Sequence, residues 1–244
     1  MHSAAIPAVG KDYKMLIVFF ASIMAACGPL AIMNVFFLQG DRITTAYASF
    51  WAFDVAIYGM LITPWLPLKS LQQHSRYDRL SLMVLIWIVT FVLIALTFEV
   101  PWLLLYKDIA AAPEAMWSYF WMMYVDGGDG RYANPTTEIL FAEVWACINA
   151  FIATIALHHW YKSGKTSVNA IYAFMFCAVM HISPTAYYYV HQISNGFPNV
   201  DTEAAGNFVA KFLLSNSCWF WMPFVLFYWC TQTIPRLFSD SYVN

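Results

Sequence analysis

Six long runs of apolar residues constrain this chain more than any other feature of its sequence. The runs cover, in chain order, residues 15–38, 45–66, 82–105, 139–160, 170–190 and 212–233. A helix needs about 20 apolar residues to cross the hydrocarbon core of a bilayer. Only helices and closed barrels satisfy their backbone in lipid, and runs of this length are typical of helices. The sequence therefore predicts an all-α transmembrane helix bundle with about six spans.

The composition agrees with a membrane protein and excludes several other classes. Only 11% of the residues are charged, whereas 61% are apolar and 19% are aromatic; a soluble domain is roughly 25% charged. The aromatic content excludes a disordered chain, and a net charge of −2 gives no field that would attract nucleic acid. The five cysteines have no paired spacing, so we expect neither a zinc site nor a disulfide framework.

The charges between the runs predict an orientation. With six spans, the two termini and two of the loops lie on one side and carry eight Lys and Arg residues, against four on the other side. Cytoplasmic loops carry the excess of basic residues in membrane proteins. We therefore expect an integral membrane protein with both termini in the cytoplasm.

The loop 107–136 is too long to be a plain connector. Its stretch 116–124 (MWSYFWMMY) is apolar and aromatic, and the turn-rich DGGDGRYANP follows it. The pattern predicts a short helix that lies in the membrane interface or folds over the bundle, with an aromatic anchor favoured over a lid. Asp126 and Asp129 fit a calcium site less well than a simple turn.

Several polar side chains lie inside the predicted spans, where ionisable residues are costly and usually functional. His181 and Thr185 share one helix face, as do Asn216 and Trp219. At 1.5 Å per residue, most of the set lies within about 7–14 Å of one membrane face. This layer contains Asp54, Glu99, Glu143, His181, Thr185, Asn216 and Trp219.

Such a layer could carry proton chemistry. One carboxyl in an apolar cavity can act as an acid while its neighbour acts as a base. The face of Trp219 would attract a cation, and Asn216 could orient a carboxyl or a substrate hydroxyl. The combination suits protonation of an alkene or epoxide and stabilisation of the carbocation that forms.

Each of these residues also has a structural interpretation. Glu99 and Glu143 could form a hydrogen-bonded pair without catalytic function, and Trp219 could serve packing alone. His181 could make an interhelical hydrogen bond. Asp54 either relays protons or pairs with a neighbouring helix.

From Asp78 onward the chain resembles the emopamil-binding protein family, the sterol delta-8/delta-7 isomerases, which share their membrane domain with the sigma-2 receptor. The similar segments are DRLSLMVLIW, FEVPWLLLYKD, the loop signature GDGRY, ILFAEVWAC, NGF and NSCWFWMP. They occur in family order and cover about 160 residues. The resemblance implies five family spans with one more at the N-terminus.

The chain then divides into a cytoplasmic N-terminus (1–14), two N-terminal spans (15–66), an isomerase-like membrane domain (78–235) with a lid-like loop (107–136), and a C-terminal tail (236–244). The resemblance implies that Glu143 donates the proton, that Glu99 accepts a proton or stabilises charge, that Trp219 holds the cation and that Asn216 orients. We expect the substrate to contact His181, Thr185, Tyr188, Trp102 and Asp54. The family has a histidine at the position of Ala95 and a threonine at that of Ala146, so standard sterol isomerisation is in doubt.

We therefore expect a cofactor-independent isomerase of sterol or terpenoid metabolism in the endoplasmic reticulum, acting by a double-bond shift, epoxide rearrangement or cyclisation. The expected partners are a hydrophobic substrate and membrane lipid, with no metal, no nucleic acid and a homodimer as one oligomeric state. A non-catalytic sterol-binding protein like the sigma-2 receptor is the first alternative, and a proton-coupled transporter is the second.

Overall fold

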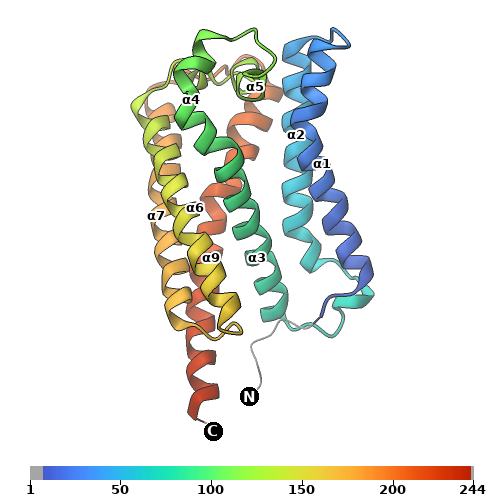
Figure 1. Ribbon diagram of the computed structural model, residues 1–244, viewed down its shortest axis with the longest axis vertical. Coiled ribbons are helices and arrows are strands. Elements are labelled where there is room, and N and C mark those ends of the chain that lie inside the picture. Colours follow the sequence, from blue (N-terminus) through green and yellow to red (C-terminus); the bar gives the residue numbers. More distant parts are fainter. Residues whose placement is uncertain (1–7, 243–244) are drawn as a thin grey trace.

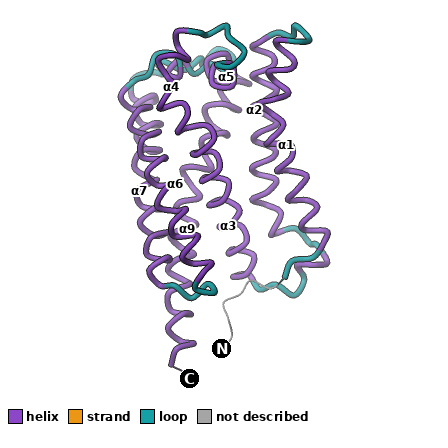
Figure 2. Tube along the Cα trace, in the orientation of Figure 1, coloured by secondary structure: helices purple, strands orange, loops and turns teal. Residues whose placement is uncertain are grey.

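The computed structural model describes residues 8–242 and is a bundle of six long helical segments (Figure 1). All six are long and apolar enough to cross a membrane, so the all-α fold and the six predicted spans are confirmed. The part of the chain that is described contains no β-strand (Figure 2). The long helices are α1 (Lys11–Phe36), α2 (Arg42–Ile62), α3 (Arg76–Ile94), α4 (Val100–Ala111), α6 (Thr137–Lys162), α7 (Val168–Ser194) and α9 (Ser215–Tyr242).

Short helical elements connect or extend these helices. The π-helical turn η3 (Ala95–Glu99) joins α3 to α4 in one continuous segment, and η5 (Phe208–Leu214) leads into α9. The remaining short elements are η1 (Thr63–Trp65), η2 (Lys69–Leu71), α5 (Tyr119–Asp126), η4 (Gly130–Tyr132) and α8 (Ala205–Asn207).

The ends of the spans differ from the sequence prediction. The last membrane segment begins at Ala205 rather than near residue 212, and α9 continues to Tyr242, so most of the predicted tail 236–244 is helical. Residues 1–7 of the predicted N-terminal segment and residues 243–244 lie outside the described residues. Both ends of the described chain lie at the same end of the bundle, as an even number of spans requires (Figure 1).

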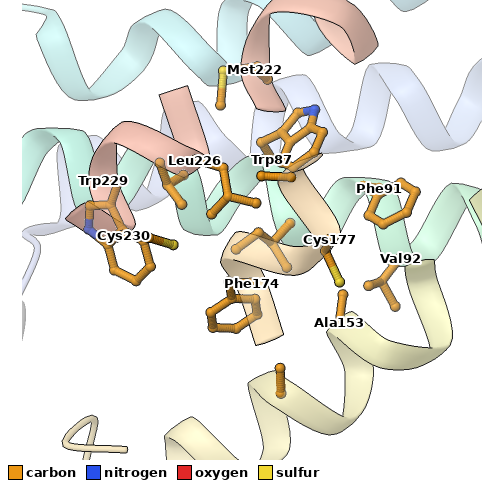
Figure 3. Packing of buried hydrophobic residues seen from close by; sticks show 14 of the residues in the cluster. Trp87, Phe91, Val92, Ala153, Phe174, Cys177, Met222, Leu226, Trp229 and Cys230 are labelled. Atoms are coloured by element: carbon orange, nitrogen blue, oxygen red, sulfur yellow. The ribbon is translucent and has the colours of Figure 1, made fainter. Parts of the chain in front are cut away.

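The largest hydrophobic core lies where α3, α6, α7 and α9 meet. Trp87, Phe91, Phe174 and Trp229 are among its buried side chains (Figure 3). Helix α1 packs mainly on α2 and buries only Tyr13, Gly28 and Ala31, so most of its apolar surface faces outward. Of the candidate catalytic residues, Glu143 lies on α6, Asn216 and Trp219 lie on α9, and Glu99 lies in η3.

Two π-helical turns widen the long helices at the depth of the polar layer. Pro101 follows η3 and has no N–H to continue the regular ladder, while the indole N–H of Trp121 donates to the carbonyl of Phe98 within the turn (3.0 Å). In η5, Ser215 Oγ and Asn216 Nδ2 donate to the carbonyls five residues earlier, at 2.9 Å and 2.7 Å. Side chains thus replace backbone donors at both turns. Such turns occur frequently at functional sites.

The loop 107–136 folds over one end of the bundle and forms α5 near the helix that the sequence predicts. Tyr119 and Trp121 are buried, so the interpretation of this segment as an aromatic interface anchor is wrong for those two side chains. Trp117, in the same aromatic stretch, is half-exposed. Asp126 accepts from Arg42 Nε at 3.0 Å, which ties the loop to the start of α2.

Candidate functional site

A small cavity lies between η3, α6, α7 and α9, with a volume of about 70 Å³. Seven of the nine residues that the sequence singles out line it, together with Tyr132, Ile139, Ala142, Ala146 and Pro184. The seven are Glu99, Glu143, His181, Thr185, Tyr188, Asn216 and Trp219. The helices therefore bring most of the predicted polar layer to one place.

Two carboxyls line this cavity. Glu99 stands at the end of the π-helical turn η3, and Glu143 lies on the second turn of α6. Tyr132 donates its hydroxyl hydrogen to Glu143 Oε1 at 2.7 Å. By contrast, Glu99 Oε2 is buried and no described residue bonds to it. One carboxyl is therefore held by a donor while the other keeps an unpaired oxygen.

Aromatic rings pack around Trp219, which lines the cavity. The ring of Trp219 lies 6.4 Å from that of His181 and 6.3 Å from that of Phe91, centroid to centroid. His181 meets Phe91 edge to face at 4.8 Å. Trp219 therefore packs against neighbouring rings and also lines the cavity.

Two other polar side chains that line the cavity already make hydrogen bonds within the chain. Asn216 Nδ2 donates to the carbonyls of Lys211 and Phe212 and lies 3.3 Å from the Tyr188 hydroxyl. Thr185 donates its hydroxyl to the carbonyl of His181 on its own helix (3.0 Å). Asn216 is therefore fixed by the widened turn before α9, and Thr185 offers a substrate mainly its methyl group and oxygen.

Two of the predicted substrate contacts lie outside the cavity lining. Asp54 is buried and accepts from Ser215 Oγ at 2.8 Å, which supports its alternative interpretation as a partner of a neighbouring helix. Trp102 is fully buried and packs edge to face on Tyr132 at 5.2 Å. Trp102 thus supports a cavity residue instead of lining the cavity itself.

A buried charge cluster lies beside the cavity and was missed by the sequence analysis. Arg131 Nε and Nη2 each donate to Asp129 at 2.8 Å, and the Tyr188 hydroxyl donates to the same carboxylate at 3.0 Å. Lys211 Nζ lies 3.6 Å from Asp129 and 4.1 Å from the centre of the Tyr124 ring. Arg131 and Lys211 are two of the four basic residues that the topology count assigns to the non-cytoplasmic side, and both are buried. Lys211, a lysine inside the apolar run FVAKFLL, was the sequence feature that could have indicated this cluster.

The loop residues of this cluster have shifted pKa values. Burial alone would raise the pKa of the Asp129 carboxyl, but Lys211 and Arg131 hold it below its ordinary value. Burial, followed by the nearby charge of Glu143, raises the pKa of Tyr132 well above its ordinary value. The Tyr132 hydroxyl therefore keeps its proton and acts as a donor to Glu143.

Backbone pairing holds this loop in register. The segment around Gly128 pairs with residues 199–201 through Gly130 N to Asn199 O (3.0 Å) and Asp201 N to Gly128 O (2.8 Å). Gly128 has a φ of +95°, a conformation that side chains with a Cβ rarely adopt. The GDGRY segment is thus a rigid turn that positions Tyr132, and its acid Asp129 is bound by cations of the chain itself.

The cavity is small for a lipid substrate. Ligand pockets usually measure about 300–1,000 Å³, so a volume of 70 Å³ holds a few water molecules. A larger groove of about 640 Å³ runs between α1 and α2, but none of the predicted site residues line it. A polycyclic ligand at the carboxyls would therefore have to displace side chains or separate helices.

Comparisons with known proteins add no relative. A scan of protein-family models, a search of curated proteins and a search of solved structures each found no match for the chain. The geometry of the cavity therefore carries the functional interpretation.

Proposed function

We propose that the chain is a cofactor-independent membrane isomerase. It protonates an alkene or epoxide of a sterol or terpenoid and guides the carbocation to a shifted double bond, a rearranged skeleton or a ring. The observation that carries the proposal is that Glu99 and Glu143 line one buried cavity together with Trp219.

The chemistry needs only groups that line the cavity. Glu143, oriented by Tyr132, transfers its proton to one alkene carbon, and a new C–H bond forms while the neighbouring carbon becomes cationic. The π face of Trp219 and the carboxylate left on Glu143 stabilise this cation. Glu99, with its unpaired oxygen, takes a proton from an adjacent carbon, and the C–H electrons form the new double bond. The substrate gains one proton and loses one, and the proton that Glu99 takes has to return to Glu143 before the next turnover.

The resemblance to the sterol isomerases supports the same roles. All four residues that it assigns line the cavity: Glu143, Glu99, Trp219 and Asn216. The family assignment, a location in the endoplasmic reticulum and cytoplasmic termini are part of this proposal. Ala95 is fully buried in η3 and Ala146 lines the cavity, so the apolar replacements stand close to the reacting groups and favour a substrate other than the standard one.

A non-catalytic lipid-binding protein like the sigma-2 receptor is the competing function. Ala95 favours it, because the histidine that the sterol isomerases have at this position belongs to their proton-transfer machinery. Such a protein would bind sterols saturably and release each of them unchanged.

Membranes that contain the protein should be incubated in deuterated water with a panel of sterols and terpenoid epoxides. The proposal predicts an isomeric product, formed from one substrate class and absent from membranes without the protein. An alkene gives a product with one deuterium on carbon, whereas an epoxide is protonated on oxygen and gives an isomer without deuterium on carbon. Saturable binding across the panel without any isomeric product would overturn the isomerase proposal and support the binding protein.

A further inference from the structure

Lys211 places a positive charge in the interior of the bundle. Its side chain is buried, and its ammonium nitrogen lies 3.6 Å from Asp129 and 4.1 Å from the centre of the Tyr124 ring. The ring centres of Tyr132 and Phe50 lie 5.6 Å and 5.5 Å from the same nitrogen. A neighbouring anion and aromatic faces both favour the charged form of a lysine.

Asp129, the acid beside Lys211, already has donors on both of its oxygens. Arg131 donates to each oxygen at 2.8 Å, and the Tyr188 hydroxyl donates to one of them at 3.0 Å. Arg131 Nη1 is buried and has no acceptor among the described residues. One carboxylate therefore serves two buried cations, and one positive charge is left over.

A buried positive charge without an anion is costly, so a further carboxylate has to balance it. The titratable and charged groups around Lys211 are Asp54 on α2, Tyr124 on α5, Asp129, Arg131 and Tyr132 in the loop 107–136, Glu143 on α6 and, one contact further out, Glu99 in η3 and Tyr188 on α7. Three of these groups are carboxyls besides Asp129: Asp54, Glu99 and Glu143.

Glu143 is the best placed of the three carboxyls. It accepts from Tyr132 at 2.7 Å, and its charge and that of Lys211 act on each other. Glu99 and Glu143 line the same cavity, and their charges interact. Two carboxylates at such a position repel each other, so only one of the two ionises readily.

Asp54 is a poorer candidate for this charge. The charge of Lys211 also acts on Asp54, but Asp54 accepts only from the neutral Ser215 hydroxyl, at 2.8 Å. Its second oxygen is buried without a partner among the described residues. The Glu99–Glu143 pair therefore carries the balancing charge.

We propose that Lys211 is a positioning residue that keeps one negative charge, and hence one proton, on the Glu99–Glu143 pair. With one proton the pair contains an acid and a base at the same time. With two protons it has no base, and with none it has no acid. Lys211 does not line the cavity and acts only through the charge of the carboxyls. The charge count follows from the cluster alone, whereas its catalytic meaning rests on the proposed function.

Infrared spectroscopy of the purified protein measures the protonated carboxyls, because their C=O band is separate from that of carboxylates and shifts in deuterated water. Wild type and Lys211→Met should be compared near neutral pH in a detergent without carbonyl groups, each with and without the double substitution Glu99→Gln, Glu143→Gln. The double substitution should remove the band of one protonated carboxyl from wild type and of two from Lys211→Met. Lys211→Gln removes the same charge and takes the place of Lys211→Met if the methionine variant does not fold.

Lys211→Arg is the matched control, since it keeps the positive charge and should keep the wild-type band. Asp54→Asn should have the same effect on the spectrum with and without Lys211→Met. The proposal is overturned if the double substitution removes equal bands from wild type and Lys211→Met, or if Lys211→Arg gains a protonated carboxyl as Lys211→Met does. It is also overturned if Asp54→Asn removes the band that Lys211→Met gains.

Once a substrate has been found, the pH profile of turnover gives a second measurement. Lys211→Met should lower turnover near neutral pH by at least about tenfold, and turnover should recover as a rising pH removes one of the two protons. An unchanged pH profile would overturn the role of Lys211. The spectra need no substrate, so a protein that shows the expected bands and forms no isomeric product has the one-proton pair without the isomerase activity.

Discussion

At the scale of single residues, the hydrogen bond from Tyr132 to Glu143 connects a loop to the candidate proton donor. Glu143 could be predicted from the sequence, because a carboxyl inside an apolar span stands out. Tyr132 could not, because it lies in a loop whose path over the bundle depends on pairing with residues 199–201. The local sequence identifies a carboxyl that is costly to bury in a membrane, but its hydrogen-bond donor is determined by the tertiary structure.

Tyr132→Phe should lower turnover by about tenfold while it lowers the stability by about 1 kcal/mol. The ring and its packing are kept, but Glu143 loses the donor that fixes which oxygen carries the proton. Turnover and thermal unfolding of the purified protein measure the two effects. Tyr124→Phe is the control, since its ring packs at a tilt against that of Tyr132, with 4.3 Å between the ring centroids. Equal losses in both variants would contradict the positioning role.

Asp129 gives a prediction about acid stability. Its folded-state pKa lies below the ordinary value of 3.8, so its ion pairs stabilise the protein above about pH 4, and this contribution is lost as the pH falls through the lowered pKa. Asp129→Asn should cost about 3–5 kcal/mol near neutral pH, because Arg131 and Lys211 stay buried without their anion.

Thermal unfolding of wild type and Asp129→Asn should be followed from pH 7 to about pH 3. The difference between the two midpoints should stay constant down to about pH 5 and shrink below about pH 4. A difference that does not change over this range would show that the carboxylate charge contributes nothing.

At the scale of the helices, the π-helical turns η3 and η5 change the backbone winding next to Glu99 and Asn216. The apolar runs predict uninterrupted helices, and the spans themselves were found with errors of a few residues at their ends. The turns were not predicted, because hydropathy does not report backbone winding. Pro101 was a visible signal for η3, and Ser215 and Asn216 were the corresponding signals before α9.

Pro101→Ala should lower turnover by more than tenfold without lowering the unfolding temperature. Alanine restores a backbone donor, so the segment can return to regular α-helix and rotate Glu99 away from Glu143. Pro29→Ala is the control, because Pro29 lies inside α1 and no residue of α1 lines the cavity. Full activity in Pro101→Ala would show that η3 is not needed to place Glu99.

At the scale of the whole molecule, the N-terminal helix pair is integrated into the bundle around the site. The resemblance implies one added span at the N-terminus. The next span, α2, supplies Asp54 to Ser215 and Arg42 to the loop over the cavity. Arg42 also bonds Glu114 at 2.7 Å and stands over the Tyr119 ring at 4.8 Å. These contacts join segments more than seventy residues apart, a distance over which local pattern carries no information.

Arg42→Gln should loosen the loop over the cavity at a cost of about 1 kcal/mol, since part of this ion-pair set is exposed and screened. Faster amide hydrogen exchange in residues 113–126 would report the effect. Arg79→Gln is the matched control, because Arg79 binds backbone carbonyls at the other end of the bundle, among them Pro64 at 3.0 Å. Equal exchange in residues 113–126 of wild type and Arg42→Gln would contradict this role.

The central claim is that Glu143 delivers a proton to carbon. It is tested most directly by mass spectrometry of the product formed in deuterated water by wild type, Glu143→Gln and Glu138→Gln, once a substrate has been found. Glu138 is a buried carboxyl on the same helix that bonds to Gln192 and His191 outside the cavity lining. The proposed mechanism predicts deuterated product from wild type and Glu138→Gln, and loss of product with retained substrate binding in Glu143→Gln. Deuterated product formed by Glu143→Gln at the wild-type rate would contradict it.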